Sequence, residues 1–162
     1  MQACSYCTIF DTISTTISVS FKLAVDQIST VAECGDSVII VTKSRQAYRF
    51  NFESSKLCKG MVQPEKLISG VEDVQTNRYC VIVLTTDGMI WVSGKDTIKI
   101  GILGLGESNF NSKALQVVPT EDPVSMISLT DNYAIALTQH NDILLWGTTL
   151  DNFFGRRVFT RR

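Results

Sequence analysis

The sequence predicts an all-β fold made of repeated antiparallel sheets, and two observations support this prediction. Residues 84–94 return in diverged form as residues 137–147, and more faintly as residues 41–51. Apolar positions upstream return in step with them: Val71 and Val74 correspond to Val124 and Ile127, and to Ile28 and Val31. Almost every periodic segment also alternates with period two, which is typical of strands. Units that recur after 43 and then 53 residues indicate a repeat architecture, in which each unit packs on its neighbours.

The expected strands follow in chain order. Residues 1–27 hold one expected strand, in which alternate positions are apolar: Ile17, Val19, Phe21, Leu23 and Val25. Three hairpins come next. The first has strands 38–41 and 48–52 joined by the turn 43–46, and the second has strands 80–84 and 89–92 joined by the turn 85–88. The third has strands 134–137 and 143–146 joined by the turn 139–142. Asp87-Gly88 is a strong turn signal, since glycine adopts a positive φ without penalty. Helical spacing is scarce, and only residues 112–117 are expected to form a short helix or an extended loop.

Each unit is expected to form a small antiparallel meander followed by a longer loop. Pro64 and Pro119 lie in these loops, where proline ends strand pairing because it cannot donate a ladder hydrogen bond. Repeated short sheets of this kind are typical of a β-propeller, which hides strand edges by radial repetition. We expect units near 28–70, 71–123 and 124–155, after an N-terminal segment 1–27 and before a basic tail 156–162.

Composition places the chain among ordinary globular domains. It has 162 residues, 44% of them hydrophobic and 19% charged, with a net charge of −1. This balance argues against a whole-domain electrostatic grip on nucleic acid or on an anionic membrane. We expect no membrane-spanning run and no secretory signal. The five cysteines are odd in number and irregularly spaced, which favours a reducing intracellular compartment, cytoplasmic or nuclear, over a disulfide framework.

The repeat motif resembles that of the regulator of chromosome condensation family. The residues that carry the resemblance are Leu84, Thr85, Asp87, Gly88, Ile90, Trp91, Gly94, Gly101, Gly104, Gly106, Pro119 and Val124, then Trp146, Gly147 and Gly155 in the second copy. The resemblance covers residues 28–155 and implies part of a β-propeller, an incomplete arc of about three blades where closed rings have about 4–8. On this resemblance the chain is expected to end inside a repeat, shortly after Gly155. The family's glycine and histidine before the Leu-Thr step are absent, and the residues found instead are Cys34 and Ser37, Asn77 and Cys80, and Thr130 and Tyr133.

Several groups of residues have a functional and a structural interpretation. Gly101, Gly104 and Gly106 could cradle a phosphate, but a dinucleotide loop needs a strand before it and a helix after it, so we expect turns. Cys4 and Cys7 have the spacing of half a zinc or redox site. Zinc usually needs four ligands, so we expect free cysteines near a loose terminus and no metal or cofactor site.

The aromatic and basic residues have open interpretations too. Trp91 and Trp146 are interpreted as equivalent repeat positions that fill the space between sheets, with an exposed binding anchor as the alternative. His140 is expected at a hairpin tip, and with no nucleophile paired to it the sequence supports no hydrolase. The arginines of the tail have two interpretations. They form a solvated end, or they act as a nuclear-localisation signal or contact phosphate or an acidic protein. These residues are Arg156, Arg157, Arg161 and Arg162.

We therefore expect a binding protein and not an enzyme. The first hypothesis is a protein-interaction or scaffold module, with loops 53–63 and 95–113 as contact segments, because function in repeat frameworks lies in the loops. The resemblance implies partners such as small GTPases, chromatin proteins or ubiquitin-pathway proteins. Two alternatives stay open: a guanine-nucleotide exchange factor for a small GTPase, whose exchange residues the motif does not identify, and a structural subunit completing a ring. Open sheet edges predict association with itself or with a completing chain.

Overall fold

Three four-stranded antiparallel sheets follow a two-stranded one along the chain. The computed structural model describes residues 27–51, 64–106 and 109–148 in full, and the backbone alone of 5–10, 16–21, 149 and 152–159. The strands are β1 (Ser5–Phe10), β2 (Thr16–Phe21), β3 (Ile28–Cys34), β4 (Ser37–Thr42), β5 (Gln46–Asn51), β6 (Glu65–Ser69), β7 (Val71–Thr76), β8 (Cys80–Thr85), β9 (Ile90–Lys95), β10 (Asn111–Val118), β11 (Val124–Leu129), β12 (Tyr133–Thr138), β13 (Ile143–Thr149) and β14 (Asn152–Phe159). The described part of the chain contains no helix, and so no helix that could cross a membrane.

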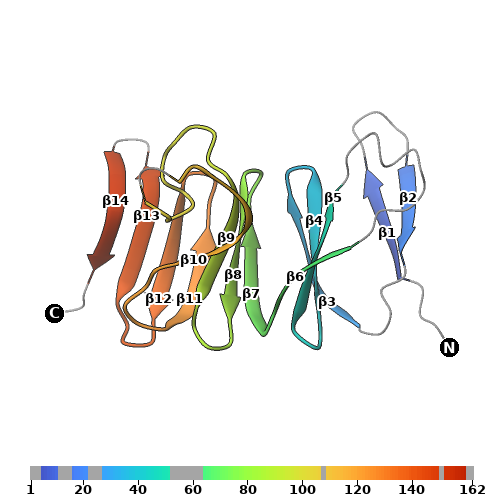
Figure 1. Ribbon diagram of the computed structural model, residues 1–162, viewed down its shortest axis with the longest axis horizontal. Coiled ribbons are helices and arrows are strands. Elements are labelled where there is room, and N and C mark those ends of the chain that lie inside the picture. The colour runs from blue at the N-terminus through green and yellow to red at the C-terminus, as the bar shows by residue number, and fades with distance from the viewer. Residues whose placement is uncertain are drawn as a thin grey trace.

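The three larger sheets are arranged as blades of a propeller. Blade 1 has the strand order β3-β4-β5-β6, blade 2 has β7-β8-β9-β10, and blade 3 has β11-β12-β13-β14. Figure 1 shows the blades side by side along the molecule. The first strand of blade 2, β7, contacts the first strands of both neighbours, β3 and β11, so the first strand of each blade is the inner one. The predicted all-β arc of about three antiparallel blades is confirmed.

Blade 2 packs one face on blade 1 and the other on blade 3, and we call the faces toward the preceding and the following position the front and the rear of a blade. Strand β8 shows this arrangement best, because it is buried at every position. Val81 and Val83 join the apolar core shared with blade 1, whereas Ile82 and Leu84 join the core shared with blade 3. The period-two alternation of this strand therefore serves two interfaces.

Backbone hydrogen bonds connect the hairpin tips of blades 1 and 2 to the blade that follows each. The amide of Val71 donates to the carbonyl of Arg45 over 3.0 Å, and the amide of Val124 donates to that of Gly88 over 2.9 Å. Arg45, Gly88 and Asn141 occupy the same position in the three tips, with φ angles of 61°, 81° and 67°. The left-handed tip residue thus turns its carbonyl toward the first residue of the following inner strand.

Three expectations differ from the structure. Residues 112–117, expected as a short helix or a loop, lie in strand β10. This outer strand is exposed at most positions on both faces, so it lacks the alternation that marks a strand. The segment 1–27 contains two paired strands where one was expected, and Cys7, expected at a loose end, lies in β1.

The C-terminal boundary differs as well. Arg156 and Arg157 belong to β14 and not to a separate tail. Leu23, Val25, Cys4, Arg161, Arg162 and residues 53–63 lie outside the described residues. Expectations about them stay predictions.

Candidate functional site

The antiparallel strands place two kinds of connection at opposite ends of the blades. The hairpin turns 43–46, 86–89 and 139–142 gather at one end, the tip end, and the long connection 96–110 between β9 and β10 lies at the other, the loop end. In Figure 1 the loop end is at the top and the tips are at the bottom. Any contact surface made of connections is therefore divided between these two ends.

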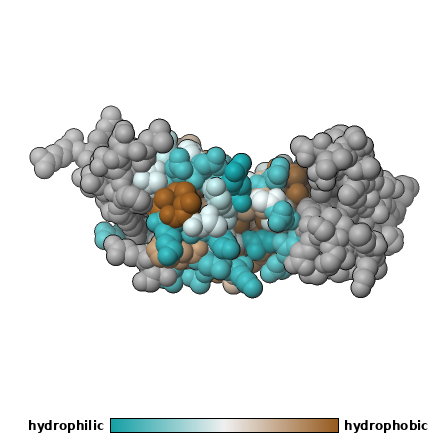
Figure 2. Space-filling model, turned by 90° about the horizontal axis from the view of Figure 1, so that it is seen from above, coloured by the Kyte–Doolittle hydropathy of each residue, from teal (hydrophilic) through white to brown (hydrophobic). Residues whose placement is uncertain are grey.

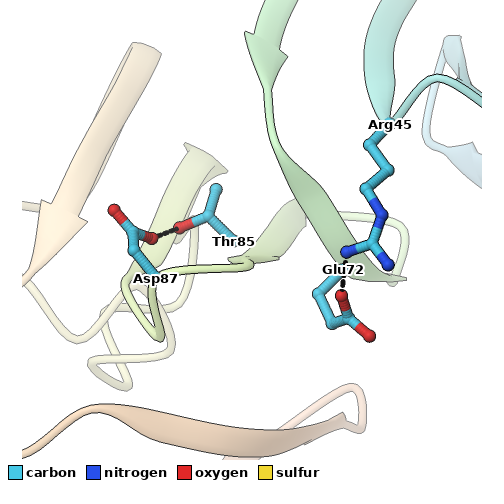
Figure 3. Close-up of polar contacts among 4 residues, drawn as sticks. All are labelled: Arg45, Glu72, Thr85 and Asp87. Carbon is cyan, nitrogen blue, oxygen red and sulfur yellow. Dashed lines mark hydrogen bonds and ion pairs between the residues drawn. The ribbon is translucent and has the colours of Figure 1, made fainter.

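At the tip end, a buried threonine supports each turn. Thr42, Thr85 and Thr138 occupy equivalent positions and are 3%, 7% and 2% exposed. In blade 2 the hydroxyl of Thr85 donates to the carboxylate of Asp87 over 2.5 Å (Figure 3). This hydrogen bond holds the pKa of Asp87 below its usual range, and the backbone amide of Met89 acts in the same direction. Asp87 is thus a fixed, ionised group on an exposed turn.

A hollow opens beside this turn, at the junction of blades 2 and 3. We call it the tip groove; its volume is about 230 Å³ and its lining residues are Asp87, Gly88, Met89, Val117, Val118, Pro119, Thr120, Glu121, Asp122 and Pro123. His140 lies on the neighbouring turn, as expected, with its Nδ1 3.1 Å from the carboxylate of Asp122. The groove combines an apolar lining with carboxylates.

The corresponding junction of blades 1 and 2 has different chemistry. There the guanidinium of Arg45 forms an ion pair with Glu72, both about half exposed (Figure 3). Arg45 stands at the turn position that Gly88 occupies in blade 2. The two junctions therefore share a backbone arrangement but not a charge pattern.

At the loop end, a buried aspartate shapes the connection 96–110. Asp96 is 4% exposed, and its carboxylate accepts hydrogen bonds from the amides of Ile100, Gly101 and Ile102 over 3.0, 2.6 and 3.3 Å. The glycine segment thus forms turns around a carboxylate of the chain itself, and not a strand-to-helix phosphate loop. Sequence reasoning missed Asp96, although an aspartate just before a glycine-rich turn is the available signal.

The turn of this loop exposes an apolar side chain. Ile98 is 58% exposed, and the next residue, Lys99, has its ammonium 5.6 Å from the centre of the Phe110 ring. Viewed from the loop end, the described surface is mainly hydrophilic, with a compact strongly hydrophobic patch over its C-terminal half (Figure 2). A rigid turn that exposes an isoleucine is a candidate contact point for a protein.

Trp146 holds the same loop from blade 3. Its indole Nε1 donates to the carbonyl of Ile102 over 2.8 Å, and its side chain is 2% exposed. Gly104 has a φ of +67°, and a Cβ there would lie 3.0 Å from the indole nitrogen. A glycine at this position therefore lets the loop close over the ring.

The two tryptophans are not equivalent, which corrects the sequence interpretation. Gly94 pairs with Cys80 and Gly147 with Tyr133, so these glycines correspond. In that register Trp146 takes the place of Ser93, and Trp91 takes the place of Leu144. Trp91 is half buried and packs against the core of blades 1 and 2. Each ring lies on the front face of its own blade, but the two positions are two residues apart when the strands are aligned.

Two polar residues at the family's altered positions were also missed. The side-chain carbonyl of Asn77 accepts from the amides of Tyr79 and Cys80, each over 2.8 Å, and its amide group donates to the carbonyl of Thr130 over 2.8 Å. Thr130 in turn accepts from the amide of Tyr133 over 3.1 Å. These side chains satisfy the turn amides, and Asn77 also joins blades 2 and 3.

Two described cysteines lie in the blade cores. Burial raises the pKa of the Cys80 thiol to about 12, with Cys34 and Asp96 adding to the effect and a hydrogen bond with Asn77 opposing it. Burial also raises the pKa of Cys34, while the positive charge of Arg49 lowers it. Neither thiol is ionised at neutral pH, so neither is an activated nucleophile.

Gly155, the last residue of the predicted motif, lies in β14.

The fold and its two loop-bearing ends define a segment of a β-propeller. No family model matches the chain. Human WBSCR16 is similar, with a TM-score of 0.66 and 14% identity over 87% of this chain and 40% of WBSCR16. Yeast RCC1 (Prp20), solved bound to Kap60, gives a TM-score of 0.62 and 16% identity over 85% of this chain and 33% of Prp20.

A second structure of the same yeast protein agrees. Prp20p from Saccharomyces cerevisiae, described with its binding properties to Gsp1p and histones, gives a TM-score of 0.57 and 11% identity over 79% of this chain and 35% of Prp20p. Such identities show a shared fold. The chain spans between 33% and 40% of the length of these propellers.

Proposed function

We propose that this chain is a protein-interaction module that presents rigid connections at the ends of its blades. The observation that carries the proposal is the loop 96–110, which exposes Ile98 while Asp96 and Trp146 fix its backbone. A preorganised apolar contact loses little conformational entropy on binding. The similar propellers Prp20p, described with Gsp1p and histones, and Prp20 bound to Kap60 support a protein partner of a general kind.

Affinity capture tests this role. The chain is immobilised, and co-purifying proteins from the native cell are compared for the wild type and the variant Ile98→Asp. We expect the variant to lose the principal partner, because a carboxylate placed in an apolar contact is desolvated without compensation. Val31→Asp is the matched control, since Val31 is also an exposed aliphatic residue, at 54%, and lies on β3. Equal capture by the wild type and Ile98→Asp would contradict the proposal.

A structural subunit that completes a ring is the second candidate, and the rear face of blade 3 supports it. The rear residues of blade 2 are at most 2% exposed: Ile82, Leu84, Ile90 and Val92. Their counterparts on blade 3 are Ile135, Leu137, Ile143 and Leu145, of which Ile143 is exposed and the others half buried. An apolar face of this kind is suited to another blade.

Sedimentation of the purified chain distinguishes this candidate. If the rear face of blade 3 drives association, the wild type and Ile98→Asp associate at micromolar concentration and Ile143→Asp does not. A monodisperse wild-type monomer would argue against this candidate and would leave the module role in place.

A more specific alternative is guanine-nucleotide exchange on a small GTPase. It is supported by the similar propeller Prp20p, which was described with its binding properties to Gsp1p. It is tested by adding the chain to candidate GTPases loaded with labelled GDP. Catalytic acceleration of GDP release would establish it, whereas stable binding without release would identify a passive binder.

A further inference from the structure

We propose that the tip groove docks a cationic segment of a protein partner, with an arginine or lysine among its carboxylates and a neighbouring apolar side chain on its lining. The proposal rests on the binding role above and adds the chemistry of the partner. It concerns the end of the blades opposite Ile98, so the two surfaces can be tested separately.

The lining is apolar and accessible. Met89 and Val117 are 38% and 36% exposed, and they are two of the six large hydrophobic side chains exposed in the described part of the chain. Pro119 and Pro123 are exposed as well and line the same hollow. Four apolar residues facing water in one concavity gain free energy when a partner's apolar atoms cover them.

Backbone hydrogen bonds hold the groove in shape before any partner arrives. The carbonyl of Gly88 accepts from Val124, and the carbonyl of Pro123 accepts from Gln139 over 2.8 Å. A Cβ on Gly88 would lie 2.6 Å from the Cβ of Pro123. The glycine therefore lets two connections meet and leaves the hollow unfilled.

The charges of the lining select a cation. Asp87, Glu121 and Asp122 line the groove, and no lysine or arginine belongs to the lining. Asp87 and Glu121 are exposed, and the Asp122 side chain is 37% exposed. Carboxylates around an apolar surface favour encounter with a positively charged partner and disfavour an acidic one.

The junction of blades 1 and 2 shows what occupies such a position within the molecule itself. There the turn residue is Arg45, and its guanidinium pairs with Glu72 across the junction (Figure 3). In blade 2 the turn residue is Gly88, which has no side chain, so no described lining residue supplies a cation to Asp87 or Glu121, and Asp122 lies beside His140. An arginine from a partner would form with Asp87, Glu121 or Asp122 the kind of ion pair that Arg45 forms with Glu72.

Binding of a labelled peptide tests the inference. The probe is Arg-Arg-Val-Phe-Thr-Arg-Arg, the sequence of residues 156–162, because it combines arginines with apolar side chains. We expect saturable binding to the full chain by fluorescence anisotropy. The triple variant Asp87→Asn/Glu121→Gln/Asp122→Asn should weaken the affinity about tenfold or more, as loss of several rim charges does. Met89→Ala/Val117→Ala should weaken it as well.

A matched variant controls for net charge. Glu33→Gln/Asp36→Asn/Asp131→Asn also removes three exposed carboxylates, but Glu33 lies near the end of β3, and Asp36 and Asp131 lie in the turns after β3 and β11, at the loop end. It should bind the peptide as the wild type does, and so should Ile98→Asp. No binding, or equal loss in both triple variants, would overturn the inference while leaving the loop-end role intact. A wild-type dimer abolished only by the tip-groove variant would overturn the partner assignment in favour of a second copy.

Discussion

The junction of blades 1 and 2 and the junction of blades 2 and 3 use the same positions with opposite chemistry. Between blades 2 and 3, Val92 lies on the rear face of β9 and Trp146 on the front face of β13. Both side chains are buried in the apolar core that these two blades share. Between blades 1 and 2, the equivalent residues are Arg49 and Ser93. The guanidinium of Arg49 donates to the hydroxyl of Ser93, and to the carbonyl of Lys113 over 3.3 Å.

This difference teaches that the interface requires volume and satisfied polar groups, and not a particular residue. A valine and a large ring achieve this on one side of blade 2, while a long cation and a small hydroxyl achieve it on the other. Ser93 is 0% exposed and Trp146 is 2% exposed, so both junctions exclude water. Buried polar atoms are tolerated where each has a partner.

The largest effect is expected at the aromatic junction. Trp146→Ala should destabilise the chain by about 3–5 kcal/mol, because it removes a buried ring and leaves the carbonyl of Ile102 without the indole donor. Trp91→Ala should cost less, since Trp91 is half buried. Urea unfolding followed by circular dichroism measures both. Equal losses would mean that the two tryptophans are energetically alike despite their different registers.

Converting one junction toward the other sharpens the comparison. Ser93→Trp alone should destabilise by about 1–3 kcal/mol, because a ring would be forced against the Arg49 side chain. Adding Arg49→Val creates the pair found between blades 2 and 3 and should restore part of the loss. A double-mutant cycle measures the coupling, expected to be about 1 kcal/mol or more. Strict additivity would refute the idea that these positions share one volume.

The cysteines report on the two cores through pH. Because burial raises the pKa of Cys80 from 9.0 to about 12, the folded state keeps a proton that the unfolded state loses above pH 9. The contribution of Cys80 to stability should therefore be constant below pH 9 and fall between pH 9 and about 12, by up to about 1.4 kcal/mol per pH unit. Cys80→Ala should flatten that slope, measured by urea unfolding at several pH values. Cys34, half buried, should also react faster than Cys80 with a thiol reagent in the native state.

The smallest effect concerns the two arginines that reach from blade 1 to blade 2. Arg49→Ala should cost about 1 kcal/mol, since it removes a part-buried hydrogen bond to the Ser93 hydroxyl and an exposed one to the Lys113 carbonyl. Arg45→Ala should cost less, because its pair with Glu72 is half exposed and such pairs contribute about 0–1 kcal/mol. Thermal unfolding in low and high salt compares them, and only the Arg45 variant should lose its difference from the wild type in salt. The reverse order would place the stronger link at the surface.

Much of this architecture could be read from local pattern. The hairpins at 80–92 and 134–146 carry strong apolar signals because β8 and β12 lie in the middle of their sheets: β8 is buried at every position and β12 at every second one. The outer strands β6 and β10 were not predicted as strands, since mostly exposed strands have no apolar alternation to detect. The prediction that Trp146 is equivalent to Trp91 rested on their shared residue type. Trp146 directly precedes Gly147, whereas Trp91 lies three residues before the corresponding Gly94, so the two positions differ.

The candidate sites were less accessible to sequence reasoning. The tip groove joins the 87–89 turn to the 117–123 connection, and each segment alone resembles an ordinary polar loop. Asp96 has a local signal in the glycines that follow it, but its burial depends on the packing of blade 3 over the loop. Arg49 and Ser93 lie 44 residues apart, and neither has a neighbour in sequence that indicates the contact.

The amino-acid sequence by itself determined the repeats, the strand periodicity and the turns, because these depend on backbone preferences and on apolar spacing within a few residues. Tertiary structure decided which faces are buried, which residue fills each junction, and where carboxylates and apolar side chains form a groove. The reason is physical: burial, cavity shape and electrostatic pairing arise between chain segments, and a blade acquires them only when the next blade covers it.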